Sequence, residues 1–478
     1  MYVALCALLP LVGGLASAFI SFKNEKKRNA FIEALTVLTS VCVLLALVYG
    51  REDRVRLFSL NARFVCALGT DGMSRIYAGL AAFLWPLCTL YAFEYMKTET
   101  HTGQFYMFYT MAYGVTLLIC ASANLFTLYI FYECLTIITL PLVEHEQNKE
   151  AYRAGRAYLV YLIGGAFLGF AAMVIAGVQG GTEFVRGGSI SADADAKLVR
   201  AAYIMAFIGF GAKAAVFPLS RWLPKASVAP TPVTALLHAA AVVNAGVFSV
   251  TRCGYYVFVA ELLRGSWAQY TAMCLASATV VYGAVRAVRE TQLKRRLAWS
   301  TVSNLGYMLF AASLLTSSGM HAALTHMLYH SLMKIVLFFC AGAIMCKTGK
   351  TDIHEMRGLS RRMPFTCAAF ALAGLALTGL PPLVGFTSKY LIVTAALENA
   401  GAFETAGAVS LIISAILTAV YIFTFLVPAY FMPARSDEPG ALKTDMGACM
   451  KTSILILSAA IICASLSGTA LSAFIGGI

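Results

Sequence analysis

The chain has 478 residues, of which 60% are hydrophobic and only 12% are charged, and its mean hydropathy is +0.76. A soluble protein of this length cannot bury so much apolar surface, whereas a bundle of membrane helices exposes it to lipid. The composition therefore excludes a soluble protein and predicts an all-α polytopic membrane protein in a lipid bilayer. The formal net charge is +13, but we expect no nucleic acid partner, because the basic residues follow a membrane topology pattern.

Apolar runs long enough to cross a bilayer as helices recur along the whole chain. They predict about 14 transmembrane helices. Most of the 36 lysines and arginines lie in loops that follow odd-numbered spans. This distribution predicts that these loops are cytoplasmic and that both termini lie outside the cytoplasm. The spans are expected near 2–22, 30–49, 74–96, 105–120, 122–143, 157–178, 200–219, 229–251, 266–287, 297–316, 321–345, 365–394, 408–431 and 452–476.

The first span ends in Ala16-Ser17-Ala18, which is similar to a signal-peptidase site. A signal peptide carries its positive charge ahead of the apolar stretch, but here the basic cluster at 23–28 follows it. We therefore expect a retained first helix, with a cleaved signal peptide as the alternative.

The sequence lacks the motifs of nucleotide-dependent and redox enzymes. No pair of its 13 cysteines has the C-x-x-C spacing of a zinc or iron–sulfur site. It also contains no phosphate-binding G-x-x-x-x-G-K-S/T loop and no G-x-S-x-G nucleophile. We expect no cofactor, no metal and no catalytic chemistry in this chain alone, so that any redox reaction takes place on a partner.

Glu133 and Lys213 are ionisable residues inside predicted spans. Buried charges in a membrane face a polar interior and mark ion pathways by default. Pro218, five residues after Lys213, is expected to break its helix and free backbone carbonyls for a wet site. A Glu–Lys contact that forms and breaks can take up and release a proton, and a static ion pair is the alternative.

The segment HMLYHSLMK places His326, His330 and Lys334 at i, i+4 and i+8, on one face of a helix. Histidine titrates near neutrality, and a buried lysine is tuned toward it, so this stripe can pass protons. A zinc site on the two histidines is one alternative, although the next turn supplies a lysine instead of a third ligand. Two histidines that simply pack between helices are another.

A third constellation, GLPPLVGFTSKYL, repeats the combination of a proline-broken helix and one buried lysine. Pro381 and Pro382 interrupt the span, and Lys389 follows within two turns. Interrupted helices in both halves of a chain are typical of inverted-repeat transporters with a site near the membrane midplane.

Several ordered motifs together resemble the antiporter-like subunits shared by respiratory complex I, membrane-bound hydrogenases and Mrp-type sodium/proton antiporters, with most similarity to the D-subunit type. The motifs are Glu133 after FY, GAKAAVFPLSRWLPKA, APTPVTALLHAAAVVNAGVF, LKRRLAWSTVSNLGYM, HMLYHSLMK, TDIHEMRGLSRRMP and GLPPLVGFTSKYL. The resemblance implies two five-helix inverted repeats, broken seventh and twelfth helices, and a multi-pass location in the inner (plasma) membrane of a prokaryote. The domains are then 1–104 (N-terminal helices), 105–258 (first repeat), 259–432 (second repeat) and 433–478 (last loop and helix).

The resemblance also implies a polar axis along the membrane plane, in which His238 joins the residues above and Lys389 controls the outlet. Many relatives carry a lysine where this chain has Asn244. An amide orders water but carries no charge, so the relay between Lys213 and Lys334 is expected to depend on His238 and water.

The predicted function is proton translocation, or sodium/proton exchange, by a subunit of a redox-driven pump or of a cation/proton antiporter. Its expected partners are other membrane subunits, further antiporter-like subunits among them. The alternatives are a self-sufficient sodium/proton antiporter and a scaffold subunit without transport. The loop at 179–200 is expected to be an exposed connector without chemistry.

Overall fold

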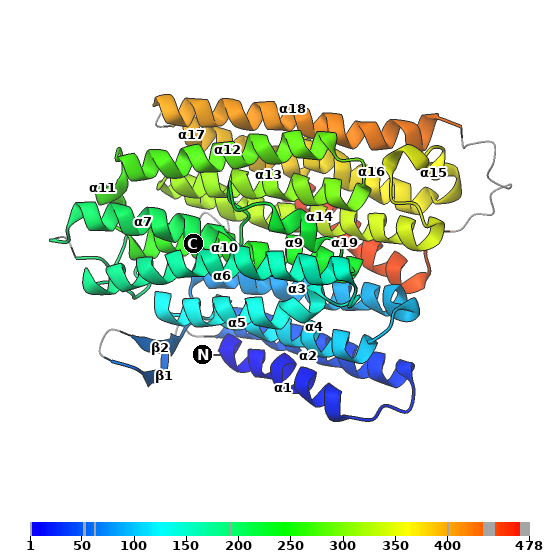
Figure 1. Cartoon of the computed structure of the whole chain (residues 1–478), viewed down its shortest axis with the longest axis horizontal. Helices are drawn as coiled ribbons and strands as arrows, with labels where there is room; N and C mark the ends of the chain where they lie inside the picture. The colour runs from blue at the N-terminus through cyan, green and yellow to red at the C-terminus, as the bar shows by residue number, and fades with distance from the viewer. Residues whose placement is uncertain are drawn as a thin grey trace.

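The computed structural model describes residues 2–50, 54–61, 64–191, 193–398, 401–433 and 445–468. Long helices run side by side along the horizontal direction of Figure 1. The first six predicted spans are each a single helix: α1 (Tyr2–Phe19), α2 (Glu25–Tyr49), α3 (Gly72–Tyr95), α4 (Thr102–Cys120), α5 (Leu125–Val143) and α6 (Lys149–Val178). A small antiparallel hairpin between α2 and α3, β1 (Val55–Ser59) with β2 (Val65–Leu68), was not expected.

The seventh and twelfth predicted spans are broken helices, as expected. The seventh consists of α7 (Ala196–Gly211), an irregular turn and the short α8 (Trp222–Ala226). The twelfth consists of α16 (Pro364–Thr378) and α17 (Val384–Leu397). The remaining helices are α11 (Ala260–Leu263), α12 (Trp267–Arg289), α13 (Leu293–Ser313), α14 (Ser317–Thr348), α15 (Leu359–Arg362), α18 (Ala402–Phe431) and α19 (Ala448–Leu466), with single 3-10 turns at Met96–Thr98 and Ile353–Glu355.

The eighth predicted span, 229–251, contains a break that was not expected. It consists of α9 (Thr231–Ala239) and α10 (Val242–Arg252), which end in a π-helical turn at Cys253–Val257. Neither proline nor glycine lies at the break, so no local signal in the sequence marks it. The break persists because the amide of Asn244 donates to the carbonyl oxygen of Ala239 at 2.7 Å and replaces a missing backbone donor.

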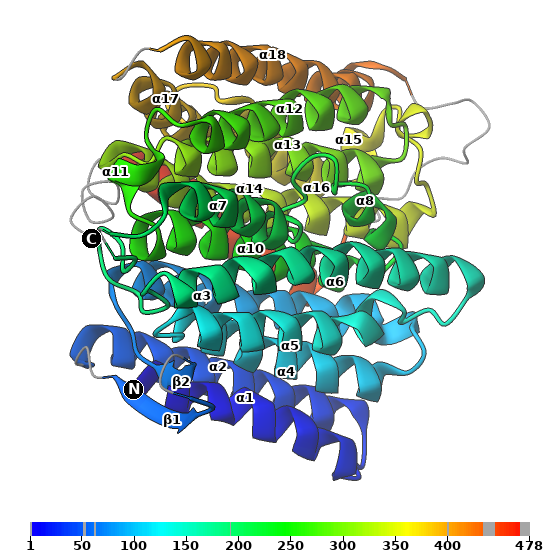
Figure 2. The same ribbon diagram turned by 60° about the vertical axis from the view of Figure 1, so that its left-hand side comes forward.

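Burial separates the helices that contact lipid from the core. In α14, 94% of the most apolar window is buried, against 28% in α1 and in α2. Figures 1 and 2 both place α14 in the middle of the molecule, whereas α1 and α18 lie at opposite sides. Within the described residues, ten helices are long and apolar enough to cross a membrane. The chain is therefore a predominantly helical polytopic membrane protein whose central helix carries the predicted histidine–lysine stripe.

An ion pair between a buried arginine and a partly exposed aspartate joins α3 to α10 at the end of the helices that carries the hairpin. Asp71 caps α3 by accepting from the Ser74 backbone at 2.9 Å. Arg252, whose side chain is 1% exposed, donates from both terminal nitrogens to the Asp71 carboxylate. Burial opposes ionisation of this carboxylate, but Arg252 and Ser74 outweigh that effect and lower the pKa of Asp71.

This pair predicts a component of stability that depends on acid pH. Because the pKa of Asp71 is lower in the folded chain, the pair stabilises the fold above the ordinary aspartate pKa and is lost as the pH falls below about 4. Replacing Asp71 with alanine leaves a buried arginine unpaired and should cost on the order of 3 kcal/mol at neutral pH. Thermal unfolding in detergent between pH 7 and pH 3 tests this, and a constant difference between variant and wild type across that range would contradict it.

Candidate functional site

Lys213 lies in the turn directly after α7, and its side chain is completely buried. Its ammonium donates to the carbonyl oxygen of Tyr132 on α5. The lysine Nζ also lies 3.4 Å from the centre of the Tyr132 ring, a cation–π contact. A buried ammonium requires such partners, because its desolvation is strongly unfavourable.

Glu133 follows Tyr132 on α5 and is half-buried. Its Oε1 atom is buried and forms no hydrogen bond within the part of the chain that the structure describes. Glu133 and Lys213 interact electrostatically, but among the described residues they form no direct ion pair. The structure thus brings the predicted pair together as neighbours, with the lysine held by backbone and one carboxylate oxygen unbonded.

The break after α7 is stabilised by side chains that bind its free carbonyl oxygens. The Tyr132 hydroxyl donates to Phe210 at 3.0 Å, and the Trp222 indole donates to Ala212 at 2.9 Å. Pro218 lies within this irregular segment and is exposed. α10 packs directly against the turn at Gly246, where a Cβ atom would lie 2.4 Å from the Ala214 nitrogen.

His238 and Asn244 lie on either side of the break in the eighth span, and both are fully buried. The His238 Nε2 atom is 3.3 Å from the Ser227 hydroxyl, and its Nδ1 has no partner in the described chain. The Asn244 amide donates to Ala239 and, at 2.9 Å, to the Ser331 hydroxyl of α14. Asn244 therefore bridges α10 to α14, while its Oδ1 atom has no hydrogen bond among the described residues.

We expect Asn244→Leu to destabilise the protein by about 1–3 kcal/mol, because the Ala239 carbonyl loses its donor in a buried site. Asn244→Asp should destabilise less at acid pH, where a protonated carboxyl can donate in place of the amide. Thermal unfolding of the detergent-purified protein measures both effects. Equal stability of Asn244→Leu and wild type would show that this hydrogen bond does not maintain the break.

Helix α14 carries His326, His330 and Lys334, and each has 0% exposure. The Lys334 ammonium donates to the Leu297 carbonyl at 3.0 Å and to the Ser300 hydroxyl, both on α13. The imidazole rings of His326 and His330 are 6.0 Å apart between centres. Both His330 ring nitrogens are buried without a well-formed hydrogen bond among the described residues, and the imidazole lies near the backbone of His238.

His326 connects α14 to two other helices. Its Nδ1 is 2.9 Å from the Ser388 hydroxyl on α17, and its Nε2 is 3.2 Å from Asn304 Oδ1 on α13. Both nitrogens are thus occupied by neutral polar groups. In the described part of the chain, no group of three or more histidine, cysteine or acidic side chains lies close enough together to hold a metal ion.

Lys389 lies on α17, and its ammonium caps the preceding half-helix. It donates to the carbonyl oxygens of Leu377 at 2.7 Å and Thr378 at 3.1 Å, the last residues of α16. A cation at a helix C-terminus is stabilised by the carbonyls that lack intrahelical partners there. Pro381 and Pro382 occupy the break beside it and are exposed, so Lys389 lies close to the surface.

Hydrogen bonds and ring contacts connect some of the predicted residues, through bridging residues that were not predicted from the sequence. Ser331 joins Asn244 to α14, Ser300 holds Lys334, and Asn304 and Ser388 hold His326. Short polar residues inside apolar spans were the available signal for them. Among the described residues, Lys213 forms no hydrogen bond with either His238 or Asn244.

Lys294 is a further buried cation, which was assigned to a loop from the sequence. It is 8% exposed, and its ammonium donates to the Ala229 carbonyl, just before α9. It interacts electrostatically with Glu146 and Glu99, and also with His238. Burial and the Glu146 charge raise the pKa of Glu99, whereas Lys294 opposes that rise. Two acidic groups therefore lie within electrostatic range of Lys294.

Comparison with known proteins identifies the family. Residues 122–418, which include every predicted site residue, match the family described as NADH:quinone oxidoreductase/Mrp antiporter, TM. The chain belongs to this family. NADH-quinone oxidoreductase subunit N of Desulforudis audaxviator is 31% identical over 96% of this chain and 94% of its own length. A Na(+)/H(+) antiporter subunit of Alkalihalophilus pseudofirmus is 33% identical over 74% of this chain, which spans only 46% of that protein.

Two solved structures share the fold of this NADH:quinone oxidoreductase/Mrp antiporter family member. A chain of the membrane-bound sulfane sulfur reductase, an archaeal respiratory membrane complex, superposes with a TM-score of 0.86 at 22% identity and covers 99% of this chain. A chain of the Mrp complex from Dietzia sp. gives a TM-score of 0.84 at 21% identity, with this chain covering 51% of it. The predicted family and its relation to multisubunit membrane complexes are confirmed, and the finer D-subunit type stays a prediction.

Proposed function

We propose that this chain is a proton-translocating subunit of a multisubunit membrane complex. In this proposal, protons move along Glu133, Lys213, His238, His330, Lys334, His326 and Lys389. The observation that carries the proposal is that three fully or almost fully buried lysines are each held by a backbone carbonyl oxygen, two of them at broken helices. Buried ammonium groups without carboxylate ion pairs are costly, and a transport role accounts for their presence.

The chemistry is an exchange of protons between neighbours whose charges influence one another. Loss of a proton from Lys334 removes a positive charge one helical turn from His330, which makes protonation of that imidazole more favourable. Asn304 and Ser388 can then orient His326 to pass the proton toward Lys389. Water at the unbonded atoms of His330 and Asn244 would complete the connections.

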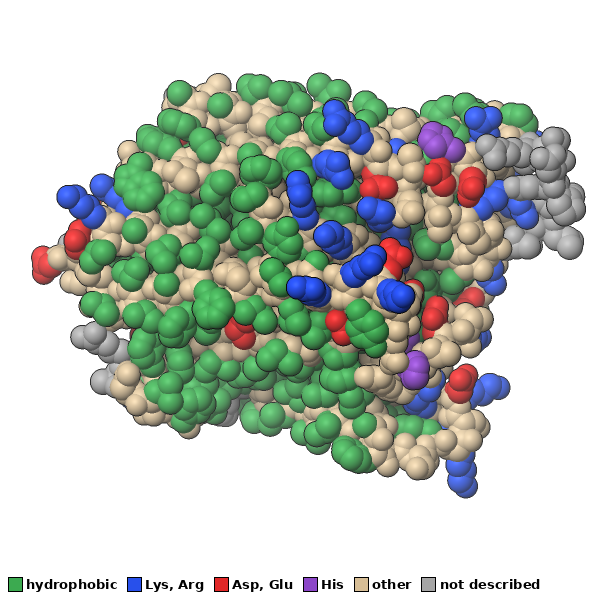
Figure 3. All heavy atoms as spheres, in the orientation of Figure 1, with side chains coloured by type: hydrophobic (Ala, Val, Ile, Leu, Met, Phe, Trp, Pro, Cys, Tyr) green, Lys and Arg blue, Asp and Glu red, His purple; other side chains and the backbone are tan. Residues whose placement is uncertain are grey.

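The orientation in the membrane follows from the charges. Figure 3 shows lysine and arginine side chains gathered toward the end of the helices opposite the hairpin. The positive-inside rule supports a cytoplasmic location for that end and a location on the other side for both termini. In this orientation Glu99, Glu146 and Lys294 supply protons from the cytoplasm to His238, and the Lys389 break near the surface supports an outlet.

Replacing Lys213 with alanine tests the proposal, because the variant removes one of the proposed proton carriers. The whole complex, reconstituted into liposomes, should lose proton translocation by roughly tenfold or more in a pH-sensitive dye assay. The exposed Lys225→Ala on α8 is the matched control and should retain wild-type flux. Normal flux in the assembled Lys213→Ala complex would favour a scaffold role.

Sodium/proton exchange is the second candidate, favoured by the unbonded buried oxygen of Glu133 and by the 33% identity to a protein named as part of a Na(+)/H(+) antiporter. Carboxylate oxygen is a suitable ligand for a hard cation. Sodium-22 uptake by liposomes containing wild type or Glu133→Gln distinguishes the two. Uptake that is present in wild type and lost in the variant would favour sodium. Iron in the purified complex would indicate redox drive by a partner.

A further inference from the structure

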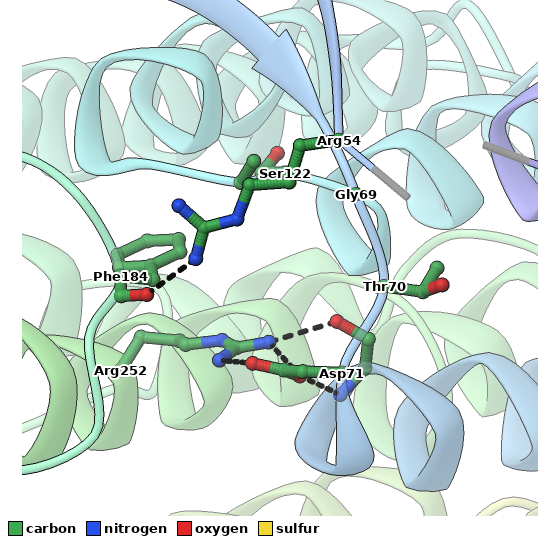
Figure 4. Close-up of a pocket in the computed structure, with 9 residues that line it drawn as sticks. Arg54, Gly69, Thr70, Asp71, Ser122, Phe184 and Arg252 are labelled. Atoms are coloured by element: carbon green, nitrogen blue, oxygen red, sulfur yellow. Dashed lines mark hydrogen bonds and ion pairs between the residues drawn. The ribbon is translucent and has the colours of Figure 1, made fainter. Parts of the chain in front are cut away.

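A polar cavity of about 80 Å³ opens at the end of the helices that carries the hairpin. Its polar side chains are those of Arg54, Thr70, Asp71, Ser74, Ser122 and Arg252, and Figure 4 shows the cavity. Polar cavities of this size hold a few water molecules. None of these residues belongs to the proposed proton series, so the cavity needs its own explanation.

The Asp71–Arg252 ion pair lies at the inner side of this cavity. Besides its two contacts with Asp71, Arg252 donates to the Ser74 hydroxyl at 2.8 Å. The guanidinium carbon lies 5.0 Å, 5.0 Å and 4.6 Å from the ring centres of Phe184, Phe248 and Tyr256. Figure 4 shows Arg252 and Asp71 facing each other, while Arg54 reaches past them to the Phe184 carbonyl.

One face of α3 leads from the cavity to the break in the eighth span. Asp71, Ser74 and Tyr77 follow one another at i, i+3 and i+6, and each contacts α10 or the residue just before it. The Tyr77 hydroxyl donates to the Ala241 carbonyl at 2.8 Å, at the break itself. The Tyr77 ring packs on Phe248 with centres 5.2 Å apart. This face therefore connects the polar groups that line the cavity with the Ala241 carbonyl at the break.

Helix α10 connects the ion pair mechanically to the centre of the molecule. Arg252 and Asn244 are eight residues apart on this helix, so their side chains point about 80° apart around its axis. Asn244 binds Ala239 on one side of the break and Ser331 on α14. A displacement of α10 that separates Arg252 from Asp71 also shifts the Asn244 amide.

We propose that the Asp71–Arg252 pair, together with Tyr77, is a gate between the cavity and the break at 240–241. When the gate is closed, it excludes cavity water from the break. When the ion pair separates, water from the cavity reaches Asn244 and His238. The proposal rests on the proposed proton-translocation function. Asp71, Arg252 and Tyr77 are positioning residues in it, since none of them exchanges a proton with the lysine and histidine series.

Cys120 provides a reporter of the gate that does not depend on transport. It is fully buried and interacts electrostatically with both Arg252 and Tyr77. In the full chain with its other cysteines replaced by serine or alanine, a small water-soluble methanethiosulfonate should label Cys120 slowly. Tyr77→Phe and Asp71→Asn should each speed labelling roughly tenfold, as expected when a closed state loses a buried hydrogen bond or ion pair.

Arg54→Gln is the matched control, because Arg54 lines the same cavity but pairs at the exposed surface with Glu183 at 3.1 Å. It should leave the labelling rate of Cys120 unchanged. Cys120 should be labelled faster in Arg252→Gln than in Arg252→Lys, because the lysine keeps the positive charge that pairs with Asp71. Unchanged labelling in folded Tyr77→Phe would overturn the gate, even if Asp71→Asn fails to assemble.

Passive proton permeability of liposomes containing the whole complex then separates the two proposals. Faster labelling together with a proton leak increased several-fold supports both the gate and the proton pathway. Faster labelling without any leak supports the gate and contradicts the central proton pathway. A leak that is equally large in Arg54→Gln would overturn the gate, because it would show a general loosening of this end of the molecule.

Discussion

Replacing Lys334 with alanine is expected to reduce proton translocation by the reconstituted complex by roughly a hundredfold, the range lost when a group that transfers protons is removed. Lys334 is completely buried in the central helix, and among the described residues it donates to a carbonyl and a hydroxyl of α13. The other lysine of α14, Lys347, is exposed near the end of this helix, so it cannot take over the buried charge of Lys334.

The control for this variant is Lys347→Ala, near the end of the same helix, where the lysine is exposed. Proton flux is followed with a pH-sensitive dye under the driving force that the intact complex uses, and assembly is checked by size-exclusion chromatography. A Lys334→Ala complex that assembles and retains more than half of wild-type flux would remove Lys334 from the pathway.

Replacing Lys389 with alanine is expected to affect both stability and transport. The variant leaves the Leu377 and Thr378 carbonyls without their donor at the C-terminus of α16, which should cost about 1–3 kcal/mol. It also removes the last proton acceptor of the proposed series, so that flux should fall roughly as far as in the Lys334 variant. Thermal unfolding and dye-monitored flux measure the two effects separately.

The conservative variant Lys389→Arg separates capping from proton transfer. A guanidinium donates to the same carbonyls but does not lose its proton in proteins. We therefore expect near-wild-type stability with little flux. If Lys389→Arg transports normally, the lysine serves only as a cap for α16.

The sequence predicted most of the helices because hydropathy reports directly on contact with lipid. It also predicted the breaks at Pro218 and at Pro381–Pro382, because proline removes a backbone donor. The break between α9 and α10 was missed, since alanines on both sides are compatible with a continuous helix. That break depends on Asn244 and Tyr77, which bind its carbonyls, and Tyr77 is distant in sequence.

For a similar reason, the sequence identified some residues of the candidate site and missed others. Charged residues within apolar spans are conspicuous, so Glu133, Lys213, Lys334 and Lys389 were identified from the sequence alone. Ser300, Asn304, Ser331 and Ser388 were not, because hydroxyl and amide side chains are common in membrane helices and usually bind their own backbone. Lys294 was assigned to a loop, although packing against Ala229 buries it.

By itself the sequence determined that this is a polytopic helical membrane protein of a known family with buried ionisable residues, because the energetics of placing charges and backbone in lipid constrain sequence strongly. Only the tertiary structure decided which carbonyl each lysine binds, that Glu133 and Lys213 are neighbours without a direct ion pair, and that Asp71 pairs with Arg252 across 181 residues of chain. These contacts join separate helices, and their partners are chosen by packing in three dimensions, on which local sequence patterns carry no information.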